Sequence, residues 1–459
     1  MRRRTFLRGS AASVVGRVAR AGEPTSTSVG KPTLGPVLAL PPTVRGFNSS
    51  ALVPRAKHDL TYDSPTIAEP LAGLRPAALR FPGGTTANSY DWRIDSFDAQ
   101  PDDRTGWAAK QLDWFRSTGR RLGLDAFANF CNRHDVTPVY VMNVHRETPE
   151  SIPEWWRRVR KVGLDLRHVE LGNETYWDPR SLMNVWSYIR SARPIAEAIR
   201  QVAPGVRIGV TFGPVDENPV DGGPYETRWN AKLAEDRSWW DAVVYHAYHG
   251  GQGIAPEPGR TPPRNPTRPE SFVAGPVRRL RRAAPDRPIW WTEWNLGGDA
   301  IDSLRGTADE MLFVASAFVE LVRHADVIPL ACFHDAFNGK FGTFGFDDHG
   351  RPIKRPTWHL WSMIGEALQD VSKVRMIEPK PDGVVTGFRG ETTAGQTRWV
   401  LVNRGTETRP IQMEDPVAKV RRMGVVERDQ IREEIEVTPT RSLPLPIAGR
   451  SVTVVSGRG

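Results

Sequence analysis

Short apolar, β-branched runs alternate with longer amphipathic stretches along most of the chain. Eight of the short runs predict strands, over residues 43–48, 77–82, 137–144, 166–173, 206–212, 241–248, 288–295 and 326–334. The stretches between them carry apolar residues at spacings of three and four, which predicts helices over 124–134, 182–202, 276–284, 308–325 and 356–368. Eight strand-then-helix units in succession favour a closed parallel barrel over a doubly wound sheet, because an open sheet needs no particular number of strands.

The pattern changes near residue 370. Short alternating runs such as "VVTGFRG" and "TRWVLVNRG" are separated by turn residues and show no helical period. The predicted fold is therefore α/β: a (β/α)8 TIM barrel over 41–369, followed by an antiparallel β-sandwich over 370–459. The leader at 22–40 contains "PTLGPVLALPP", which could add strands to that sandwich. A cap packed on the barrel is favoured over an independent sugar-binding module.

Composition is that of a globular protein, with 39% hydrophobic and 25% charged residues and no apolar run long enough to span a membrane. The formal charge of +9 at first suggests a nucleic-acid partner. Six arginines and no acidic residues lie within residues 1–21, however, which leaves +3 (9 − 6) for the rest of the chain. We therefore expect neither a nucleic-acid nor a membrane partner.

The basic N-terminus "MRRRTFLRGS" resembles a twin-arginine export signal, and Ala19-Arg20-Ala21 resembles a signal-peptidase site. We expect residues 1–21 to be a signal peptide and the protein to be exported to the periplasm or beyond the cell. A basic N-terminus that stays in the cytosol is the alternative. Cys131 and Cys332 both lie in apolar segments, which predicts buried free thiols.

Polar side chains cluster where the predicted strands end. In a barrel of this kind, catalytic groups come from the C-terminal ends of the strands. Those ends supply Arg80, Asn143, Asn173, Glu174, His246, Tyr248 and Glu293. The fourth and seventh strands would thus hold Glu174 and Glu293 facing one another across the mouth of the barrel.

Two facing carboxyl groups are what glycoside hydrolysis requires. One is protonated and assists the leaving group, while the other is ionised and attacks the anomeric carbon or activates water. Their surroundings must push the two pKa values apart, and Arg80 could hold Glu293 ionised.

Tryptophans near the strand ends are candidates for stacking on a sugar ring, because an indole presents a large apolar face with a polar edge. We select Trp177 and Trp294 as substrate-binding candidates. Trp291 shares a strand face with Glu293 in a regular strand, so it could instead fill the barrel.

Four motifs in order resemble the clan A retaining glycoside hydrolases: "LRFPGG" at 79–84, "ELGNE" at 170–174, "HAY" at 246–248 and "WTEWN" at 291–295. The nearest groups are the α-L-arabinofuranosidases, the β-xylosidases and the heparanase-like β-glucuronidases, and the resemblance covers about 41–455. It implies that Glu174 is the acid/base, Glu293 the nucleophile, Asn173 a binder of the sugar 2-hydroxyl, Tyr248 a hydrogen-bond partner of the nucleophile, Arg80 its brace and His246 part of the pocket wall. It further implies carboxyl groups about 5–5.5 Å apart.

Two departures from the arabinofuranosidase pattern bear on the substrate. The first strand, "RGFNSSALV", lacks the glutamate that those enzymes direct at the sugar, and Thr85 stands where they have asparagine. Both argue against a furanose and leave xylosides and uronides open. Arg260, Arg264 and Arg268 in a proline-rich loop could reach a substrate carboxylate, although a solvated, stiffened loop is favoured.

We consider three other charged residues and two other functions beside this assignment. Glu170 lies four residues deeper than Glu174 and is expected to pair inside the barrel, while Asp91 and Arg93 could line a subsite or form a local ion pair. Neither HExxH nor CxxC is present, so we expect no metal and no cofactor. A retaining glycosidase acting on oligosaccharides or polysaccharides is the main hypothesis. A non-catalytic carbohydrate-binding barrel and a transglycosidase are the alternatives, and homo-oligomerisation stays open.

Overall fold

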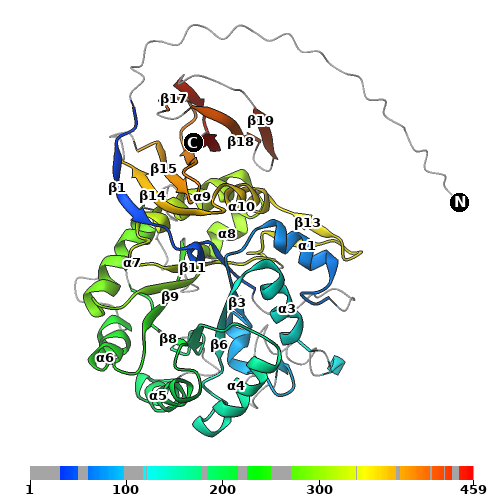
Figure 1. Cartoon of the computed structure of the whole chain (residues 1–459), viewed down its shortest axis with the longest axis vertical. Coiled ribbons are helices and arrows are strands. Elements are labelled where there is room, and N and C mark those ends of the chain that lie inside the picture. The colour runs from blue at the N-terminus through cyan, green and yellow to red at the C-terminus, as the bar shows by residue number, and fades with distance from the viewer. Residues whose placement is uncertain are drawn as a thin grey trace, which may run out of the picture.

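The structure is a computed structural model and describes residues 31–49, 60–97, 117–119, 121–176, 183–215, 225–249, 270–337, 339–378, 383–413, 416–427, 430–436 and 444–457. It comprises a barrel ringed by helices and, stacked on one side of it, a domain of antiparallel strands (Figure 1). Both parts of the predicted fold are confirmed.

Eight parallel strands close the barrel in the order β10-β11-β2-β3-β6-β7-β8-β9. They are β2 (Gly46–Asn48), β3 (Ala78–Phe81), β6 (Thr137–Met142), β7 (His168–Leu171), β8 (Arg207–Thr211), β9 (Ala242–His249), β10 (Ile289–Leu296) and β11 (Leu330–His334). Each coincides with a run that the sequence pattern assigned to a strand, although β9 and β10 extend one residue beyond the predicted end. These runs are almost continuously apolar because helices cover one face of the strands while the other fills the barrel.

The helices that cover the barrel are α1 (Pro65–Gly73), α3 (Leu124–His134), α4 (Ile152–Lys161), α5 (Val185–Val202), α6 (Ala231–Glu235), α7 (Glu270–Ala283), α8 (Gly298–Leu304), α9 (Ala308–Arg323) and α10 (Pro356–Ala367). Shorter pieces are the 3-10 turns η1 (Pro42–Arg45), η2 (Thr85–Ser89) and η3 (Pro149–Ser151), the π-helical η4 (Tyr225–Asn230), and the hairpins β4 (Tyr90–Asp91)–β5 (Ser96–Phe97) and β12 (Phe344–Phe346)–β13 (Pro352–Lys354). Among the described residues, no helix combines the length and apolar character needed to cross a bilayer.

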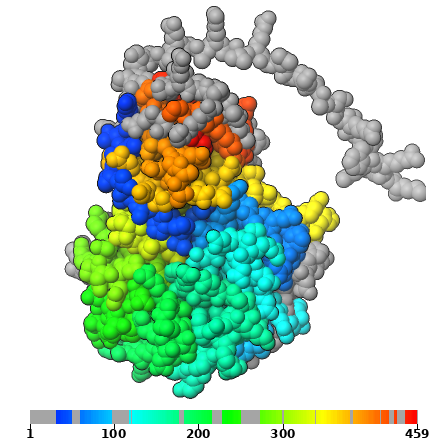
Figure 2. Space-filling view, in the orientation of Figure 1, coloured from blue at the N-terminus to red at the C-terminus, as the bar shows by residue number. Residues whose placement is uncertain are grey.

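The C-terminal domain is a seven-stranded antiparallel sheet in the order β1-β14-β15-β16-β21-β18-β19, with the small sheet β17-β20 facing it. Its strands are β1 (Leu34–Ala39), β14 (Val371–Ile377), β15 (Val385–Thr392), β16 (Thr397–Asn403), β17 (Arg409–Gln412), β18 (Val417–Glu427), β19 (Gln430–Glu436), β20 (Pro444–Ile447) and β21 (Ser451–Gly457). Figure 2 shows the N-terminal β1 lying against this domain, where it pairs with β14.

The large sheet has two apolar faces. One packs on α9 and α10, where Phe388 of β15 approaches Phe318 of α9 with ring centroids 6.4 Å apart. The other encloses a second core with β17 and β20 that includes Trp399, Leu401 and Ile447. Helix α9 is consequently buried on nearly all sides, which explains why its sequence is apolar all round.

A separate cluster of apolar side chains, most of them small, fills the interior of the barrel: Ala78, Val139, Ala242, Val244, Trp290, Leu330 and Cys332. Gly209 lies beside Trp290, and a Cβ there would approach Val244 Cγ2 to 2.6 Å and the indole of Trp290 to 2.7 Å. Cys131 and Cys332 are both buried free thiols, as predicted.

Strand β10 contains an irregularity that sets the direction of its side chains. Three steps along β10, from Trp290 to Glu293, match two steps along β9, from Val244 to His246, which is the mark of a β-bulge. After the bulge, Glu293 points into the barrel although an even alternation from Trp290 would turn it outward.

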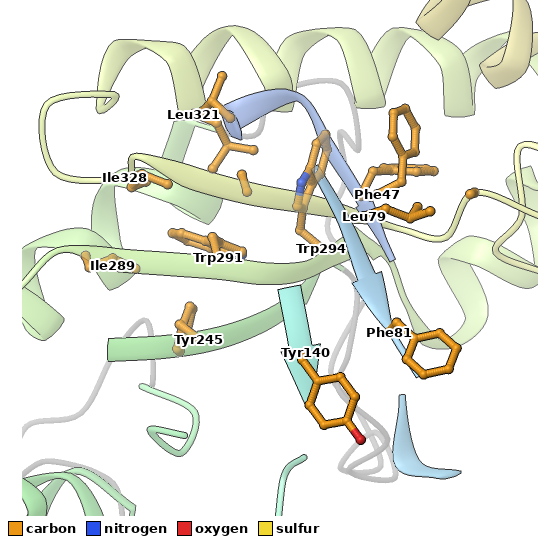
Figure 3. Close-up of a cluster of buried hydrophobic side chains, with 14 of the residues drawn as sticks. Phe47, Leu79, Phe81, Tyr140, Tyr245, Ile289, Trp291, Trp294, Leu321 and Ile328 are labelled. Atoms are coloured by element: carbon orange, nitrogen blue, oxygen red, sulfur yellow. The ribbon is translucent and has the colours of Figure 1, made fainter. Parts of the chain in front are cut away.

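The same bulge corrects the expectation that Trp291 shares a face with Glu293. The ring of Trp291 lies outside the barrel beside Tyr245, 4.9 Å away (Figure 3), and 6.0 Å from Phe272. Trp290 fills the interior instead. A regular period of two gives the wrong face here because β10 carries one extra residue.

Candidate active site

Glu174 and Glu293 meet at the mouth of the barrel. Glu174 follows β7 and Glu293 lies in β10, and one carboxylate oxygen of each, together with a ring nitrogen of His246, lies within 4.8 Å of the others. The side chain of Glu174 is 19% exposed, whereas that of Glu293 is 5% exposed. The two carboxyl groups are therefore adjacent but unequal in their access to solvent.

The chain leaves β7 through an unusual backbone that aims Glu174 at this mouth. Gly172 has a φ of 76° and Glu174 a φ of 46°, the left-handed region that costs a side-chain-bearing residue roughly 1–2 kcal/mol. Asn88 of η2 holds the peptide between them: its Oδ1 accepts from the Asn173 backbone N–H at 2.9 Å, and its Nδ2 donates to the Asn173 carbonyl at 2.6 Å. This fixed turn replaces an ordinary strand end.

Arg80 links the "ELGNE" motif to Glu293 of the "WTEWN" motif. Its guanidinium is fully buried and donates to Glu170 Oε2 at 2.8 Å, to Glu293 Oε1 at 2.7 Å and to Asn173 Oδ1 at 2.8 Å. Burial alone would lower the pKa of Arg80, but Glu170 and Glu293 raise it further than burial lowers it. Arg80 is therefore a permanent positive charge under the site, and Glu170 is its interior partner.

Glu293 is held ionised by its neighbours. Oε1 accepts from Arg80 and from Asn48 Nδ2 at 3.1 Å, and Oε2 accepts from the Tyr248 hydroxyl at 2.5 Å. Burial would raise the pKa of Glu293, but His246, His334 and Arg80, together with the Tyr248 hydroxyl, outweigh it and hold the pKa well below its usual range. Glu293 thus presents an anion whose Oε1 is anchored twice.

His246 lies between the carboxylates. Its Nδ1 is 2.9 Å from Glu174 Oε1 and 3.9 Å from Glu293 Oε1, and its Nε2 is 3.2 Å from Thr292 Oγ1. Burial lowers the pKa of His246, but the two glutamates raise it by more, so the net pKa is higher than usual. His246 Nδ1 and Glu174 Oε1 are thus direct hydrogen-bond partners.

Tyr248 stays protonated beside the nucleophile candidate. Burial, followed by the charges of Glu293 and Glu174, raises the pKa of Tyr248 well above its ordinary value. Its hydroxyl therefore acts as a donor to Glu293 across the neutral pH range.

Asn48 and His334, which sequence reasoning did not select, also contact the site. Asn48 ends β2 and His334 ends β11. The two side chains are hydrogen-bonded to each other, and Asn48 also donates a hydrogen bond to Glu293. The signal was present, because both residues close barrel strands, as "GFN" and "CFH". Applying the strand-end rule to the first and eighth strands would have found them.

Trp294 is a correction to the predicted site. Its side chain is 1% exposed and packs outside the barrel against Phe333 and Trp361, with ring centroids 5.1 Å and 5.9 Å away (Figure 3). The bulge that turns Glu293 inward turns Trp294 outward, so the indole cannot stack on a ligand.

Asn143 makes two hydrogen bonds within the protein, and its predicted contact with substrate stays a prediction. Its Nδ2 donates to the Tyr90 carbonyl at 3.1 Å and its Oδ1 accepts from the His145 backbone N–H at 3.1 Å, so it braces two loops at the rim. Trp177, Arg260, Arg264 and Arg268 lie outside the described residues.

The rim motif "YDWRID" forms an ion-pair network. Arg93 Nη1 is 3.0 Å from Asp91 Oδ1 and 3.0 Å from Glu147 Oε1, and Arg146 Nη2 is 2.8 Å from Asp91 Oδ2. Of the two readings left open for Asp91 and Arg93, the geometry corresponds to the ion pair.

Glu174, His246 and Glu293 have donor atoms close enough together to resemble a metal-binding cluster. Arg80 already lies 2.7 Å from Glu293, and His246 carries a raised pKa. A metal ion would be repelled by the buried guanidinium of Arg80, so the charges suit an acid–base site better.

No protein-family model matches the chain, and neither does any curated protein sequence. Solved structures do match. A family 51 α-L-arabinofuranosidase from Bifidobacterium longum gives a TM-score of 0.70 at 13% identity, over 92% of this chain and 97% of that one. An α-L-arabinofuranosidase from Thermotoga maritima, solved as an arabinose complex, gives 0.67 at 17% identity, over 92% and 99%.

A third similar structure is a 4-O-α-L-rhamnosyl-β-D-glucuronidase from Fusarium oxysporum, with a TM-score of 0.59 at 13% identity over 93% of this chain and 99% of that one. At these identities the likeness shows the fold. The chain has the barrel-and-sandwich architecture of these glycoside hydrolases over almost its whole length.

Proposed function

We propose that the protein is a retaining glycoside hydrolase that cleaves O-glycosidic bonds of oligosaccharides or polysaccharides. The observation that carries the proposal is the pair Glu174–Glu293, whose nearest carboxylate oxygens lie within 4.8 Å in unequal surroundings. Retaining enzymes hold their carboxyl groups about 5–5.5 Å apart, whereas inverting enzymes need about 6.5–9.5 Å to admit a water molecule. An oxygen-to-oxygen distance within 4.8 Å is compatible with the retaining arrangement.

In the first step, Glu293 Oε2 attacks the anomeric carbon. Oε1 is anchored by Arg80 and Asn48, so Oε2 is the oxygen that forms the bond. The Tyr248 hydroxyl, which donates to Oε2, either moves away or stays hydrogen-bonded as the bond forms. The anomeric C–O bond to the leaving group breaks as Glu174 transfers its proton to the departing oxygen. A glycosyl ester on Glu293 and a free alcohol result.

In the second step, the roles reverse. Glu174, now a carboxylate, removes a proton from water, whose oxygen attacks the anomeric carbon as the ester bond to Glu293 breaks. Arg80 and Tyr248 stabilise the carboxylate that departs. His246 Nδ1, 2.9 Å from Glu174 Oε1, holds this carboxyl group in place for the step.

The residue that ends the first barrel strand bears on whether the substrate is a furanoside or a pyranoside. The similar structures include enzymes named for arabinofuranosides and for a glucuronide. This chain ends β2 in Asn48, an amide occupied with Glu293 and His334, where the arabinofuranosidase pattern has a glutamate for the sugar. We therefore favour a pyranoside, either a xyloside or a uronide, over a furanoside.

A panel of aryl glycosides tests the proposal directly: xyloside, arabinofuranoside, glucuronide, glucoside and galactoside. On the glycoside that is cleaved, Glu293→Ala should lose turnover, and azide should restore part of it as an external nucleophile. Glu150→Ala is the matched control, because Glu150 is an exposed carboxylate on the loop after β6. Wild-type rates for Glu293→Ala would contradict the assignment.

Two outcomes favour the alternatives. Tight oligosaccharide binding by calorimetry, with no product from any glycoside, would indicate a binding protein. Oligosaccharide products longer than the substrate would indicate transglycosylation, which uses the same residues with a sugar in place of water.

Export through the twin-arginine route is a separate part of the proposal, carried by the sequence of residues 1–21. Replacing Arg3 and Arg4 together by lysine should leave the protein in the cytosolic fraction, whereas the unaltered chain should be found outside it. Equal distribution of both chains would contradict export by this route.

A further inference from the structure

His334 ends β11 beside the nucleophile candidate. Its ring packs edge-on against Tyr248 and Phe341, with centroids 5.7 Å and 5.2 Å away, and its side chain keeps 11% of its surface exposed. One ring nitrogen, Nδ1, is 3.5 Å from Glu293 Oε2 and 2.8 Å from Asn48 Nδ2. The imidazole is thus fixed in orientation and still reaches the open side of the site.

Asn48 determines which ring nitrogen of His334 carries the proton. The Asn48 amide donates to Glu293 Oε1 and lies against His334 Nδ1. Turning the amide over would set its oxygen against the anionic Glu293 carboxylate, so the NH₂ group must face both partners. His334 Nδ1 is therefore the acceptor, and the proton of the neutral ring is on Nε2.

His334 is neutral at ordinary pH. Burial, reinforced by the positive charges of Arg80 and His246, lowers the pKa of His334 to about 4 although Glu293 opposes them. A second ring proton would also point at the donating NH₂ of Asn48. The Nε2–H tautomer is the form that these neighbours accept.

Nε2 of His334 has no hydrogen-bond partner among the residues that the structure describes. Asp335 Oδ2 lies 4.0 Å from it, beyond hydrogen-bond range. A polar N–H at the mouth of a site, held in one orientation and left for a ligand, is a specificity device, since substrates without an acceptor leave it unsatisfied.

The barrel order locates the sugar atom that this N–H would meet. In the sequence β10-β11-β2-β3-β6-β7-β8-β9, strand β11 lies four places from β7 and so directly across the barrel from Glu174. Glu174 faces the departing oxygen, which places the leaving group on its side. The side of β11 therefore faces the glycone.

We propose that His334 is a specificity-determining residue whose Nε2–H donates to a hydroxyl or other acceptor oxygen of the glycone, with Asn48 as the positioning residue that fixes its tautomer. The inference rests on the proposed glycosidase function. The oxygen can belong to a ring hydroxyl or to an exocyclic group, because both present lone pairs to the same donor.

Two conservative variants separate the two ring nitrogens. Asparagine places an amide oxygen near the Nδ1 position, so His334→Asn keeps the acceptor for Asn48 and removes the donor to the sugar. Glutamine places an amide nitrogen near the Nε2 position, so His334→Gln restores a donor. Both remove the aromatic packing, so a purely structural role would affect them alike.

The experiment uses the aryl glycoside that the full chain cleaves fastest, together with its monodeoxy analogues. His334→Asn should lower kcat/KM about 3- to 10-fold, the value of one neutral hydrogen bond, and His334→Gln should recover most of this loss. One deoxy analogue should cost the wild-type protein a similar factor, and with that analogue wild type and His334→Asn should react equally.

The same His334→Asn to wild-type ratio for every deoxy analogue would overturn the inference while leaving the glycosidase proposal intact. No cleavage of any glycoside by the wild-type protein would overturn both. A ¹⁵N spectrum of histidine-labelled wild-type protein tests the tautomer without any variant, so misfolding of His334→Asn does not block the test: an unprotonated Nδ1 is expected, and a protonated Nδ1 overturns the inference.

Discussion

Removing Arg80 should destabilise the barrel strongly, because three buried partners depend on it. Arg80 and Glu170 are fully buried and Glu293 is 5% exposed. Breaking a buried ion pair by deleting one partner costs about 3–5 kcal/mol, since the remaining charge stays buried without a partner. We expect Arg80→Met to lose that much, or about 4–7 °C of Tm for a cooperative unit as large as the barrel.

A second substitution tests the cause. Among the described residues, Glu170 Oε1 has no hydrogen-bond partner, so the pairing of Glu170 depends on Arg80 at Oε2. Glu170→Gln removes the charge and keeps the shape. In the Arg80→Met background it should restore about 1–3 kcal/mol, whereas in the wild-type background it should destabilise. Urea unfolding followed by tryptophan fluorescence measures all four proteins.

The pH dependence of the free energy of unfolding shows whether Arg80 stabilises the protein through its charge. In the wild-type protein the pKa of Glu293 is depressed, so its ionisation contributes stability above its unfolded pKa and that contribution is lost as pH falls. In Arg80→Met one opposing charge is gone, and the pKa of Glu293 moves up. The stability gap between the two proteins should therefore be constant near neutral pH and narrow as pH falls below about 4.5, the ordinary range of a glutamate.

The reasoning would be refuted by either of two results. One is a loss below about 1 kcal/mol at neutral pH, within the range of an ordinary substitution. The other is a gap that does not narrow as pH falls below about 4.5, which would mean that Arg80 stabilises by packing rather than by charge.

Three further predictions follow from particular contacts. Tyr248→Phe should lower kcat/KM about tenfold or more, the value of a hydrogen bond to a charged group, and should move the acid limb of the pH–rate profile to higher pH, because the pKa of Glu293 rises without the hydroxyl; an unmoved limb would argue against the contact. Trp294→Ala should cost about 3–5 kcal/mol of stability in urea titrations yet leave kcat/KM of the folded protein within about threefold, and a tenfold loss would reinstate Trp294 as a ligand contact. Gly209→Ala should destabilise by about 1–3 kcal/mol, because its Cβ would meet Trp290; a Tm equal to wild type would show that the barrel relaxes there.

The alternation of apolar runs was sufficient to predict the barrel, because eight strands buried on both faces leave a strong and regular signal. The strand-end rule likewise predicted Arg80, Glu174 and Glu293 as neighbours. Trp294 could not be placed from the sequence, because the extra residue in β10 leaves no mark in the pattern and reverses the face of every later side chain.

The site also illustrates what sequence position alone leaves undetermined. Asn48 lies in a three-residue strand, and its orientation depends on Glu293 and His334, 245 and 286 positions away. Such long-range contacts are a property of the closed barrel rather than of any local stretch. They become visible only when the first and last strands pair through β2 and β11.

Strand β1 precedes the barrel in sequence but completes the sheet that follows it. Leu34 pairs with Ile377, which lies 343 positions later (377 − 34). At about 5–20 residues per second, a ribosome needs roughly 20–70 s to make the intervening chain. The edge formed by β1 therefore stays without its partner throughout synthesis of the barrel. The pairing of β1 with β14 is thus a folding step that can follow only after the barrel sequence has been made.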